Sequence, residues 1–433
     1  MSQVNTTLYA LNKNGSYQEW KVFVEGKVVT VEFGQVGGKK QYKETTCEAT
    51  NVGRANERSP EDQALFEANA KWEKQYRLGY REDIEDLSNE QNFSPMLAHD
   101  ASKKPHLVQY PCDVIRKLDG LRCLITFDEA GVPVFNTRGN KTYPLTNINL
   151  VSQLEFLYGE FGYGMLDGEI YIHGLPLQKI VSLAKKYRTH ESIEAEIEKD
   201  YQSDIKRRDK AIKEGKVEWK NWNKEVLPVS AEPVKDVDRY YGYCSDDLEF
   251  HIFDIPQKGV KWNNDSSDKQ GRYIQLQELH NIIQENEGLT HLTVLDIVTN
   301  VQTEEKVKEY IGQFMSEGYE GVIIRNHNGV YEFGQRSNDL LKWKLFKDTE
   351  AKVVDVEVDK NNEGVLHCIL QNGIKFKCKM RGSHSYRLYD RQKELIGKFI
   401  TVRYQQVTED GVPQFATGVV EREVDPKTWE PLE

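Results

Sequence analysis

Between residues 95 and 346 the sequence predicts short β-strands that carry charged residues where a plain core would have apolar ones. Several of these charges stand beside a glycine, near a strand end. The pattern predicts a region in which strands dominate, helices are interspersed and charged side chains are placed for chemistry. The charged segments, in chain order, are KLDGLR (117–122), NTRG (136–139), LDGEI (166–170), FHIFDI (250–255), EGVIIR (320–325) and LLKWK (340–344).

Lys117 stands between a strand-like run over 114–117 and a turn at Asp119-Gly120, after which 121–127 reads as the return strand. This arrangement predicts that Lys117 lies at a strand end and faces a cleft. A lysine is a nucleophile only when neutral, and desolvation or neighbouring cations lower its pKa in that direction. Taken alone, the same residues also fit a surface hairpin.

Lys342 and Lys344 lie two residues apart in a predicted strand, so their side chains point to the same face. Because two ammonium groups repel, an anion is expected between them, and phosphate is the natural candidate. Glu169 and Glu320 stand next to glycines and could be oxygen ligands for Mg²⁺. Each residue alone also fits an ordinary surface position; the occurrence of all the segments in one order argues against that reading.

The composition is that of a soluble globular chain of about three domains, with 433 residues and a net charge of −11. This charge excludes a protein coated in positive charge, but not a basic face that binds nucleic acid. The six scattered cysteines form no CxxC pair, which favours a reducing compartment over a zinc or redox motif. With no signal peptide or long apolar run, we expect a cytoplasmic protein without a membrane partner.

Residues 5–46 read as short strands separated by turns. A helix follows, with Ser59 as its N-cap and Gly79 near its end. Its predicted apolar face consists of Leu65, Ala68, Trp72 and Tyr76. These features predict a small α+β domain over residues 1–85, with an acidic linker at 82–92.

Residues 185–235 are rich in Lys and Arg interleaved with Glu, and predict an exposed helical insertion or a long loop. Both a solvated surface and a contact surface for a phosphate backbone remain open for this segment. From Ala351 onward the pattern is all-β, with a hairpin at Asn372-Gly373 for which a type I′ turn is expected. The short strands of 347–433 predict a small barrel such as an OB-fold.

The ordered set of charged segments resembles the covalent nucleotidyltransferases, most closely the ATP-dependent DNA ligases, over about residues 93–346. The runs SPMLA (94–98) and YEFGQRSNDLLKWK (331–344) resemble the same family, and the tail resembles its OB domain. The resemblance implies an α+β fold. An adenylation (nucleotidyltransferase) domain of antiparallel sheets with flanking helices spans 86–346, an OB-fold β-barrel follows, and a small α+β domain precedes.

The small N-terminal domain resembles WGR domains, which bind DNA, through Phe33-Gly34-Gln35, Tyr42 and the 59–79 helix. The namesake triplet reads Phe-Gly-Gln here, so its Trp and its Arg are both missing. An unrelated small packing domain is the alternative.

The resemblance implies four catalytic residues. Lys117 resembles the lysine that becomes adenylylated, and Asp119 resembles the aspartate that helps to place the reacting ends and the metal. Lys342 and Lys344 resemble cations that contact phosphate.

It also implies a nucleotide site. Arg122 and Arg138 resemble contacts to ribose and phosphate, and Arg325 and Arg336 resemble further phosphate contacts. The aromatic that stacks on adenine corresponds to Phe253, with Ile323 on the opposite ring face. For the metal, the matching residues are Glu169, which is also near the ribose, and Glu320.

The cofactors implied are ATP and Mg²⁺, with Mn²⁺ as a substitute, and the partner implied is nicked double-stranded DNA. A monomer is the expected state, in the host cytoplasm if the source is viral. The implied reaction seals a 5′-phosphate to a 3′-hydroxyl through a lysyl-AMP and a DNA-adenylate. RNA ligase, mRNA guanylyltransferase and a non-catalytic nick-binding protein are the alternatives.

Three features depart from the family pattern. Ile115 stands where many members have an acidic residue, the insertion at 185–235 is not part of the common core, and no convincing Arg-x-Asp-Lys motif ends the tail. The tail therefore contributes no expected catalytic residue.

Overall fold

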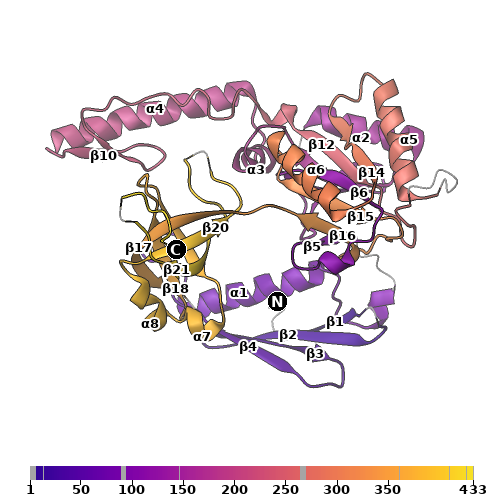
Figure 1. Ribbon diagram of the computed structural model, residues 1–433, viewed down its shortest axis with the longest axis horizontal. Coiled ribbons are helices and arrows are strands. Elements are labelled where there is room, and N and C mark those ends of the chain that lie inside the picture. Colours follow the sequence, from indigo (N-terminus) through magenta and orange to yellow (C-terminus); the bar gives the residue numbers. More distant parts are fainter. Residues whose placement is uncertain are drawn as a thin grey trace. The chain divides into compact units, whose positions relative to one another are not determined.

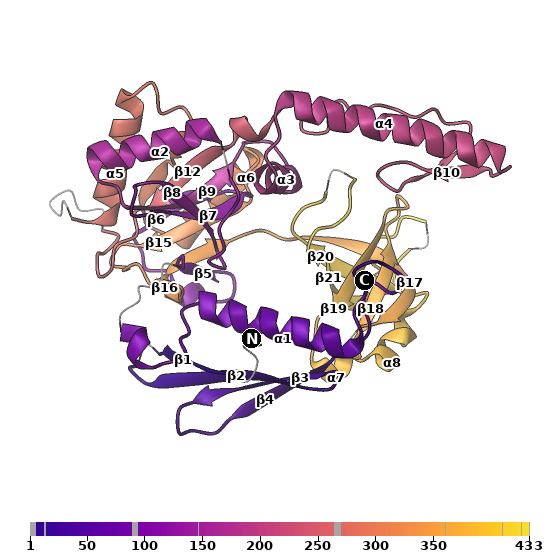
Figure 2. The same cartoon turned by 180° about the vertical axis from the view of Figure 1, so that it is seen from behind.

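The computed structural model describes residues 6–12, 14–88, 94–145, 147–263, 270–359, 361–408, 410–425 and 427–432. The chain forms two compact units, one of Met1–Asn92 with Trp343–Glu433 and one of Phe93–Lys342. Their boundaries lie a few residues from the domain limits expected at 85 and 346. Figures 1 and 2 show the elements from opposite sides. None of the helices in the described stretches is long and apolar enough to cross a lipid bilayer.

Two five-stranded sheets form the centre of the unit Phe93–Lys342. The first has the order β13 (Leu292–Val294), β12 (Glu249–Asp254), β9 (Met165–Tyr171), β7 (Leu121–Phe127) and β8 (Pro133–Thr137). The second has the order β14 (Ile297–Val301), β6 (Cys112–Lys117), β15 (Gly321–Asn326), β16 (Arg336–Trp343) and β5 (Leu97–Asp100). Antiparallel pairing joins β6 to β14 and β15, β7 to β8 and β9, and β9 to β12. The pairs β12–β13 and β16–β5 are parallel, unlike the antiparallel sheets expected.

The strands on either side of Lys117 belong to different sheets. Lys117 is the last residue of β6 in the second sheet, whereas Leu121 begins β7 in the first. The expectation that 121–127 returns alongside the preceding strand is therefore wrong. The segment 118–120 instead carries the chain from one sheet to the other, which leaves Lys117 at the crossing.

Helices flank both sheets of this unit. The helices α2 (Ile148–Phe161), α3 (Leu177–Lys185) and α5 (Arg272–Glu285) contact strands of the first sheet, and α6 (Glu304–Ser316) contacts the second. Short 3-10 turns, η2 (Pro105–Leu107) and η3 (Ser245–Asp247), lie in the connections. In α6 the apolar side chains recur at helical spacing, and Val307, Ile311 and Phe314 are buried on one face.

The insertion is a long helix followed by a hairpin. The helix α4 (His190–Lys213) leads to β10 (Glu218–Lys220) and β11 (Val226–Pro228), which pair antiparallel. In both views α4 projects away from the sheets of its unit, with β10 near its far end (Figures 1 and 2). The structure thus confirms an exposed helical insertion.

The N-terminal residues form a meander of β1 (Thr7–Leu11), β2 (Tyr17–Glu25), β3 (Val28–Gln35) and β4 (Gln41–Thr46). The helix α1 (Pro60–Arg77) follows, then η1 (Glu85–Ser88) within the expected linker. The Ser59 side chain caps α1 by accepting the amide of Asp62 at 3.1 Å, as predicted. The buried face is Ala64, Ala68 and Trp72, so Leu65, expected on it, is 43% exposed.

The C-terminal residues form a closed barrel of β17 (Lys347–Val358), β18 (Gly364–Ile369), β19 (Lys375–Met380), β21 (Thr417–Arg422) and β20 (Phe399–Tyr404), in that spatial order. The short helices α7 (His384–Arg387) and α8 (Tyr389–Gln392) and the turn η4 (Lys393–Leu395) lie between β19 and β20. This confirms the predicted barrel. The β18–β19 turn is not type I′, because its positive φ is confined to Gly373, and Leu370 bonds Ile374 across a three-residue loop.

Candidate active site

A cavity lies between the two sheets of the unit Phe93–Lys342. Its volume is about 910 Å³ when the open space at its mouth is counted. The second sheet contributes Lys117, Ile323, Arg325, Arg336 and Lys342, and the first contributes Arg122, Glu169 and Phe253. Arg138, just after β8, also lines it.

Lys117 is mostly buried in this cavity, with 18% of its side chain exposed. Its Nζ forms an ion pair with Glu320 Oε2 and lies 3.3 Å from the carbonyl of Leu118. The pairing of β15 with β6 places Gly321 opposite Lys117, and the amide of Glu320 donates to the Lys117 carbonyl at 2.9 Å. Sheet register, rather than a flexible loop, therefore fixes the Lys117–Glu320 contact.

The pKa of Lys117 lies below its usual value. Burial lowers it, the carboxylates of Glu169 and Asp119 act in the opposite direction, and the Arg122 guanidinium lowers it further. The side chain is thus held where its neutral form is less costly than in water.

Glu169, on β9, lies near Lys117 and the β6–β7 connection. Its Oε1 accepts the amide of Gly120 at 3.0 Å, and burial raises its pKa against the opposing charges of Lys117 and Arg122. A Cβ at position 120 would lie 2.6 Å from the carbonyl oxygen of Ile170 and 2.9 Å from Cγ of Glu169. Only glycine allows this close approach of the β6–β7 connection to β9.

Phe253 and Ile323 are the apolar walls of the cavity that were expected to contact a base. Phe253, on β12, is 8% exposed, and Ile323, on β15, is half-buried. The Arg122 guanidinium lies over the Phe253 ring at 4.3 Å from the centroid. Arg122 is itself fixed, because it donates to both oxygens of Asp167 at 2.7 and 2.5 Å. This forked pairing uses two of its donors, and the expected contact of Arg122 to ribose or phosphate stays a prediction.

Arg325 is bonded to the same strand as Phe253. It is 2% exposed and donates to Asp254 Oδ2 at 2.5 Å and to the Phe253 carbonyl at 3.1 Å. Arg272 donates to the other oxygen of Asp254 at 2.8 Å. These bonds hold the β12 backbone at Phe253, and the expected phosphate contact of Arg325 stays a prediction.

Three other cations do converge on the cavity. Lys342, Arg138 and Arg336 line it with Lys117. Burial and then the positive charges of Lys117, Arg336 and Arg138 lower the pKa of Lys342, with Asp100 opposing. Such mutual repulsion marks a site that gains stability when an anion binds.

Among the predicted residues, Asp119, Glu320 and Lys344 are not part of the cavity lining. Asp119 is half-buried in the connection between β6 and β7, and its charge acts on Lys117 and Glu169. Lys344 belongs to the other unit and donates to Gln405 Oε1 at 3.0 Å. Of the two lysines of the expected clamp, Lys342 lines the cavity, and the role of Lys344 stays a prediction.

Asp167, Asp254 and Tyr331 were not assigned a role from the sequence. Asp167 and Asp254 are fully buried, and the Tyr331 hydroxyl donates to Asp167 Oδ2 at 2.5 Å. Both aspartates lie inside segments already recognised as charged. A carboxylate in the middle of an apolar strand is the signal that could have indicated a buried ion pair.

Glu169 and Glu320 both neighbour Lys117 and offer hard oxygen donors. In the described part of the chain, the one group of three or more His, Cys, Asp or Glu side chains close enough to share an ion is His190, Cys244 and Asp247. That group does not line the cavity. The two glutamates fit Mg²⁺, which usually takes one or two carboxylates and completes its shell with phosphate oxygens and water.

Comparison with known proteins gives two family matches. Residues 245–344 match the model of the ATP dependent DNA ligase domain, and residues 359–422 match the DNA ligase OB-like domain. A DNA ligase of African swine fever virus (isolate Warthog/Namibia) is 30% identical over 196 residues, covering 41% of this chain and 45% of the relative. A DNA ligase of Haemophilus influenzae is 32% identical over 132 residues, covering 29% and 47%. The chain thus spans about half the length of the curated relatives it matches.

Two solved structures share the fold. One comes from a structure–function study of Lig E DNA ligases and matches with a TM-score of 0.50 and 19% identity, covering 76% of this chain and 99% of that one. The other, Pmar-Lig_PreS3, has a TM-score of 0.53 and 18% identity, covering 84% and 73%.

The two facing sheets and the barrel that follows form the fold that this chain shares with the Lig E DNA ligase structure. Residues 245–344 and 359–422 are thus similar to the catalytic and OB-like domains of ATP-dependent DNA ligases.

Proposed function

We propose that this protein is an ATP-dependent DNA ligase that seals nicks between a 5′-phosphate and a 3′-hydroxyl in duplex DNA. The observation that carries the proposal is the placement of Lys117. Its amine is paired with Glu320 and lines a cavity together with further cations, among them Lys342, Arg138 and Arg336. A buried amine beside a proton acceptor and an anion site suits nucleophilic attack on phosphorus.

In the first step Nζ of Lys117 attacks the α-phosphorus of ATP. A nitrogen–phosphorus bond forms, the bond to the bridging oxygen breaks, and pyrophosphate leaves with that oxygen. The amine must lose its proton, and Glu320, its ion-pair partner, is the nearest acceptor. Lys342, Arg138 and Arg336 stabilise the charge that develops on the phosphate oxygens.

The base would lie between Phe253 and Ile323, which face the cavity from different sheets. Arg122 and Arg325 position Phe253 through the contacts described above. The contributions of Asp119 and Lys344 rest on the family resemblance alone.

Glu169 and Glu320 would hold Mg²⁺, or Mn²⁺, which prefers the same oxygen ligands. When bound, the ion supplies further neutralisation of phosphate charge.

In the later steps AMP passes from Lys117 to the 5′-phosphate of the nick, with Lys117 as the leaving group. The 3′-hydroxyl then attacks that phosphate and displaces AMP, which leaves a phosphodiester bond. Contacts to the DNA would be mainly to the backbone, so sealing should depend little on sequence.

The test is a sealing assay on a nicked DNA duplex and on a nicked RNA duplex, each with ATP, GTP or NAD⁺. We expect sealing of DNA with ATP and Mg²⁺, and none by Lys117→Ala. Sealing of RNA alone, or nucleotide transfer from GTP alone, would replace this proposal with RNA ligase or guanylyltransferase. Tight binding to the nick without turnover would identify a non-catalytic nick-binding protein.

A further inference from the structure

We propose that the insertion formed by α4, β10 and β11, residues 190–239 and here called the arm, binds the phosphate backbone of duplex DNA through its far end. The inference rests on the proposed function and assigns a substrate-binding surface to it. The arm lies outside both family matches, which begin at residue 245 and residue 359.

The arm is fixed at its root. Arg188 donates to the carbonyls of Ser182 and Lys186 at 2.6 and 3.1 Å, and its Nε pairs with Glu196 of α4 at 3.3 Å. The Ser245 hydroxyl accepts the Arg188 amide at 2.8 Å. These bonds join the end of α3, the start of α4 and the segment before β12, so the helix leaves its unit in a defined direction.

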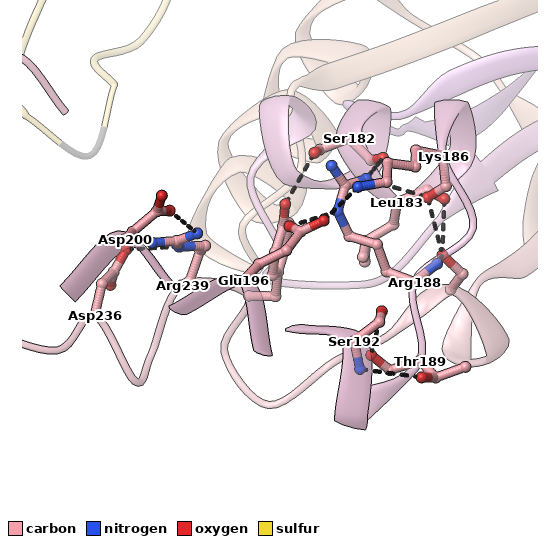
Figure 3. Close-up of polar contacts among 12 residues, drawn as sticks. Ser182, Leu183, Lys186, Arg188, Thr189, Ser192, Glu196, Asp200, Asp236 and Arg239 are labelled. Atoms are coloured by element: carbon pink, nitrogen blue, oxygen red, sulfur yellow. Dashed lines mark hydrogen bonds and ion pairs between the residues drawn. The ribbon is translucent and has the colours of Figure 1, made fainter. Parts of the chain in front are cut away.

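The returning chain is anchored to the same helix. Arg239 pairs with Asp200 at 2.9 Å and with Asp236 at 3.2 Å (Figure 3), and Arg239 also lies over the Trp222 ring at 4.0 Å. Ile193 and Ile197, in the first two turns of α4, are buried in the core of the unit. The root of the arm is therefore packed on several sides.

The far end of the arm has its own small core. Trp219 of β10 is 4% exposed, and its indole nitrogen donates to the Pro228 carbonyl at 3.1 Å. Arg208 of α4 donates to the Val229 carbonyl at 2.8 Å and pairs with Glu232 at 2.7 Å. The hairpin is thus held against the helix, so its lysines are carried on a structured surface.

Charge is segregated along the arm. The start of the arm, residues 190–204, holds six acidic side chains and one basic one. The far end, residues 206–224, holds eight basic side chains and three acidic ones. A helix of 24 residues is about 36 Å long, so these two regions are well separated. In a chain of net charge −11, such a local excess of cations is not a consequence of composition.

The lysines at the far end are available for binding. Lys206, Lys213, Lys220 and Lys224 are exposed, and within the described residues no ion pair involves any of them. Lys206, Lys210 and Lys213 recur at helical spacing, which places them on one face of α4 over about 10 Å.

Duplex DNA carries about one negative charge for every 1.7 Å of its axis, so a lysine row of this length meets several phosphates. The acidic start of α4 would repel the same polyanion. Contact is therefore confined to the far end of the arm. Neutralising phosphates releases counterions and gives an affinity that falls with salt.

The test compares the full-length protein with two quadruple variants. In one, Lys206, Lys213, Lys220 and Lys224 become alanine, and in the other they become arginine, which keeps the charge. Affinity for a long nicked duplex is measured by fluorescence anisotropy between about 0.05 and 0.2 M salt. Adenylylation by ATP without DNA is measured on the same samples.

We expect the alanine variant to lose about tenfold or more in nick affinity at low salt, with a salt dependence flatter by up to about 3.6 in log–log slope. The arginine variant should bind like the unchanged protein, and all three should be adenylylated equally. Equal affinity and slope for the alanine variant would overturn the inference, as would an equal loss in the arginine variant. Absence of adenylylation in the unchanged protein would instead reject the proposed function.

Discussion

The ion pair between Lys117 and Glu320 lies where the chain crosses between sheets. The Lys117 amine has to be held in place as a cation and also has to lose its proton before it can react. The pair stabilises the charged lysine in a poorly solvated site, whereas the proposed attack needs the lone pair on Nζ. Burial lowers the pKa of Lys117 and thus favours the form that reacts. We infer that Glu320 keeps the amine in place and accepts its proton.

Glu320→Gln should slow adenylylation by about 100-fold or more, because the amide cannot accept the proton. The measurement is the initial rate of protein–AMP formation. Glu317→Gln is the matched control, since Glu317 lies three residues away and pairs with Arg116 at 2.8 Å rather than with Lys117. An unchanged rate for the Glu320 variant would remove this carboxylate from the reaction.

Gly120→Ala should disturb the packing of the β6–β7 connection against β9 through a steric clash, without changing any charge. The added methyl would lie 2.6 Å from the Ile170 carbonyl, so Glu169 or the backbone must shift. We expect a loss of about 2 kcal/mol in the free energy of unfolding, measured by urea denaturation, together with slower adenylylation. Gly164→Ala, with nothing within 4 Å of the new Cβ, should change neither. Equal stability of the two variants would contradict the packing argument.

At the scale of elements, the register of β15 on β6 and the crossing between sheets assemble the cavity. The strands and most charged segments could be predicted, because apolar alternation and adjacent glycines are local signals. The pairing of Arg325 with Asp254, and of Arg122 with Asp167, could not, because each joins side chains from strands far apart in sequence. Leu65 was misplaced on α1 by one position, since the buried stripe follows Ala64, Ala68 and Trp72.

In the barrel, Glu363, just before β18, forms ion pairs with side chains of β19 and α7. It accepts from Lys379 of β19 at 2.7 Å, from Arg387 at 2.6 Å and from His384 at 3.0 Å, and these bonds lower its pKa to about 2. A carboxyl group with a depressed pKa in the folded state adds stability above its unfolded value near 4.5. That stability is lost as the pH falls towards 2.

Glu363→Gln should therefore lower the free energy of unfolding of the barrel by about 2 kcal/mol at neutral pH. The difference from the unchanged protein should shrink between about pH 4.5 and pH 2, as followed by urea denaturation at each pH. Glu394→Gln, at an exposed position, is the control. A constant difference across that range would show that protonation of Glu363 is not the cause.

On the scale of the whole molecule, the cavity and the arm belong to one of the two units. Every residue that lines the cavity lies in the unit Phe93–Lys342, whereas the N-terminal meander and α1 belong to the other unit. The WGR-like, DNA-binding character of residues 1–85 stays a prediction.

Removal of residues 1–85 should leave adenylylation without DNA largely unchanged, because no residue of the cavity is lost. Nick affinity should fall, most at low salt if the lost contacts are to phosphates. Cooperative urea unfolding of the shortened chain checks that it is folded. Equal nick affinity at every salt concentration would remove the DNA-binding role from this domain.

The most direct test of the whole account is the location of the covalent nucleotide. The protein is incubated with ATP and Mg²⁺, digested and mapped by mass spectrometry. We predict one AMP on the peptide that contains Lys117, in an acid-labile and alkali-stable linkage, and no adduct in Lys117→Arg. An adduct on another residue, or one that survives in that variant, would contradict the account.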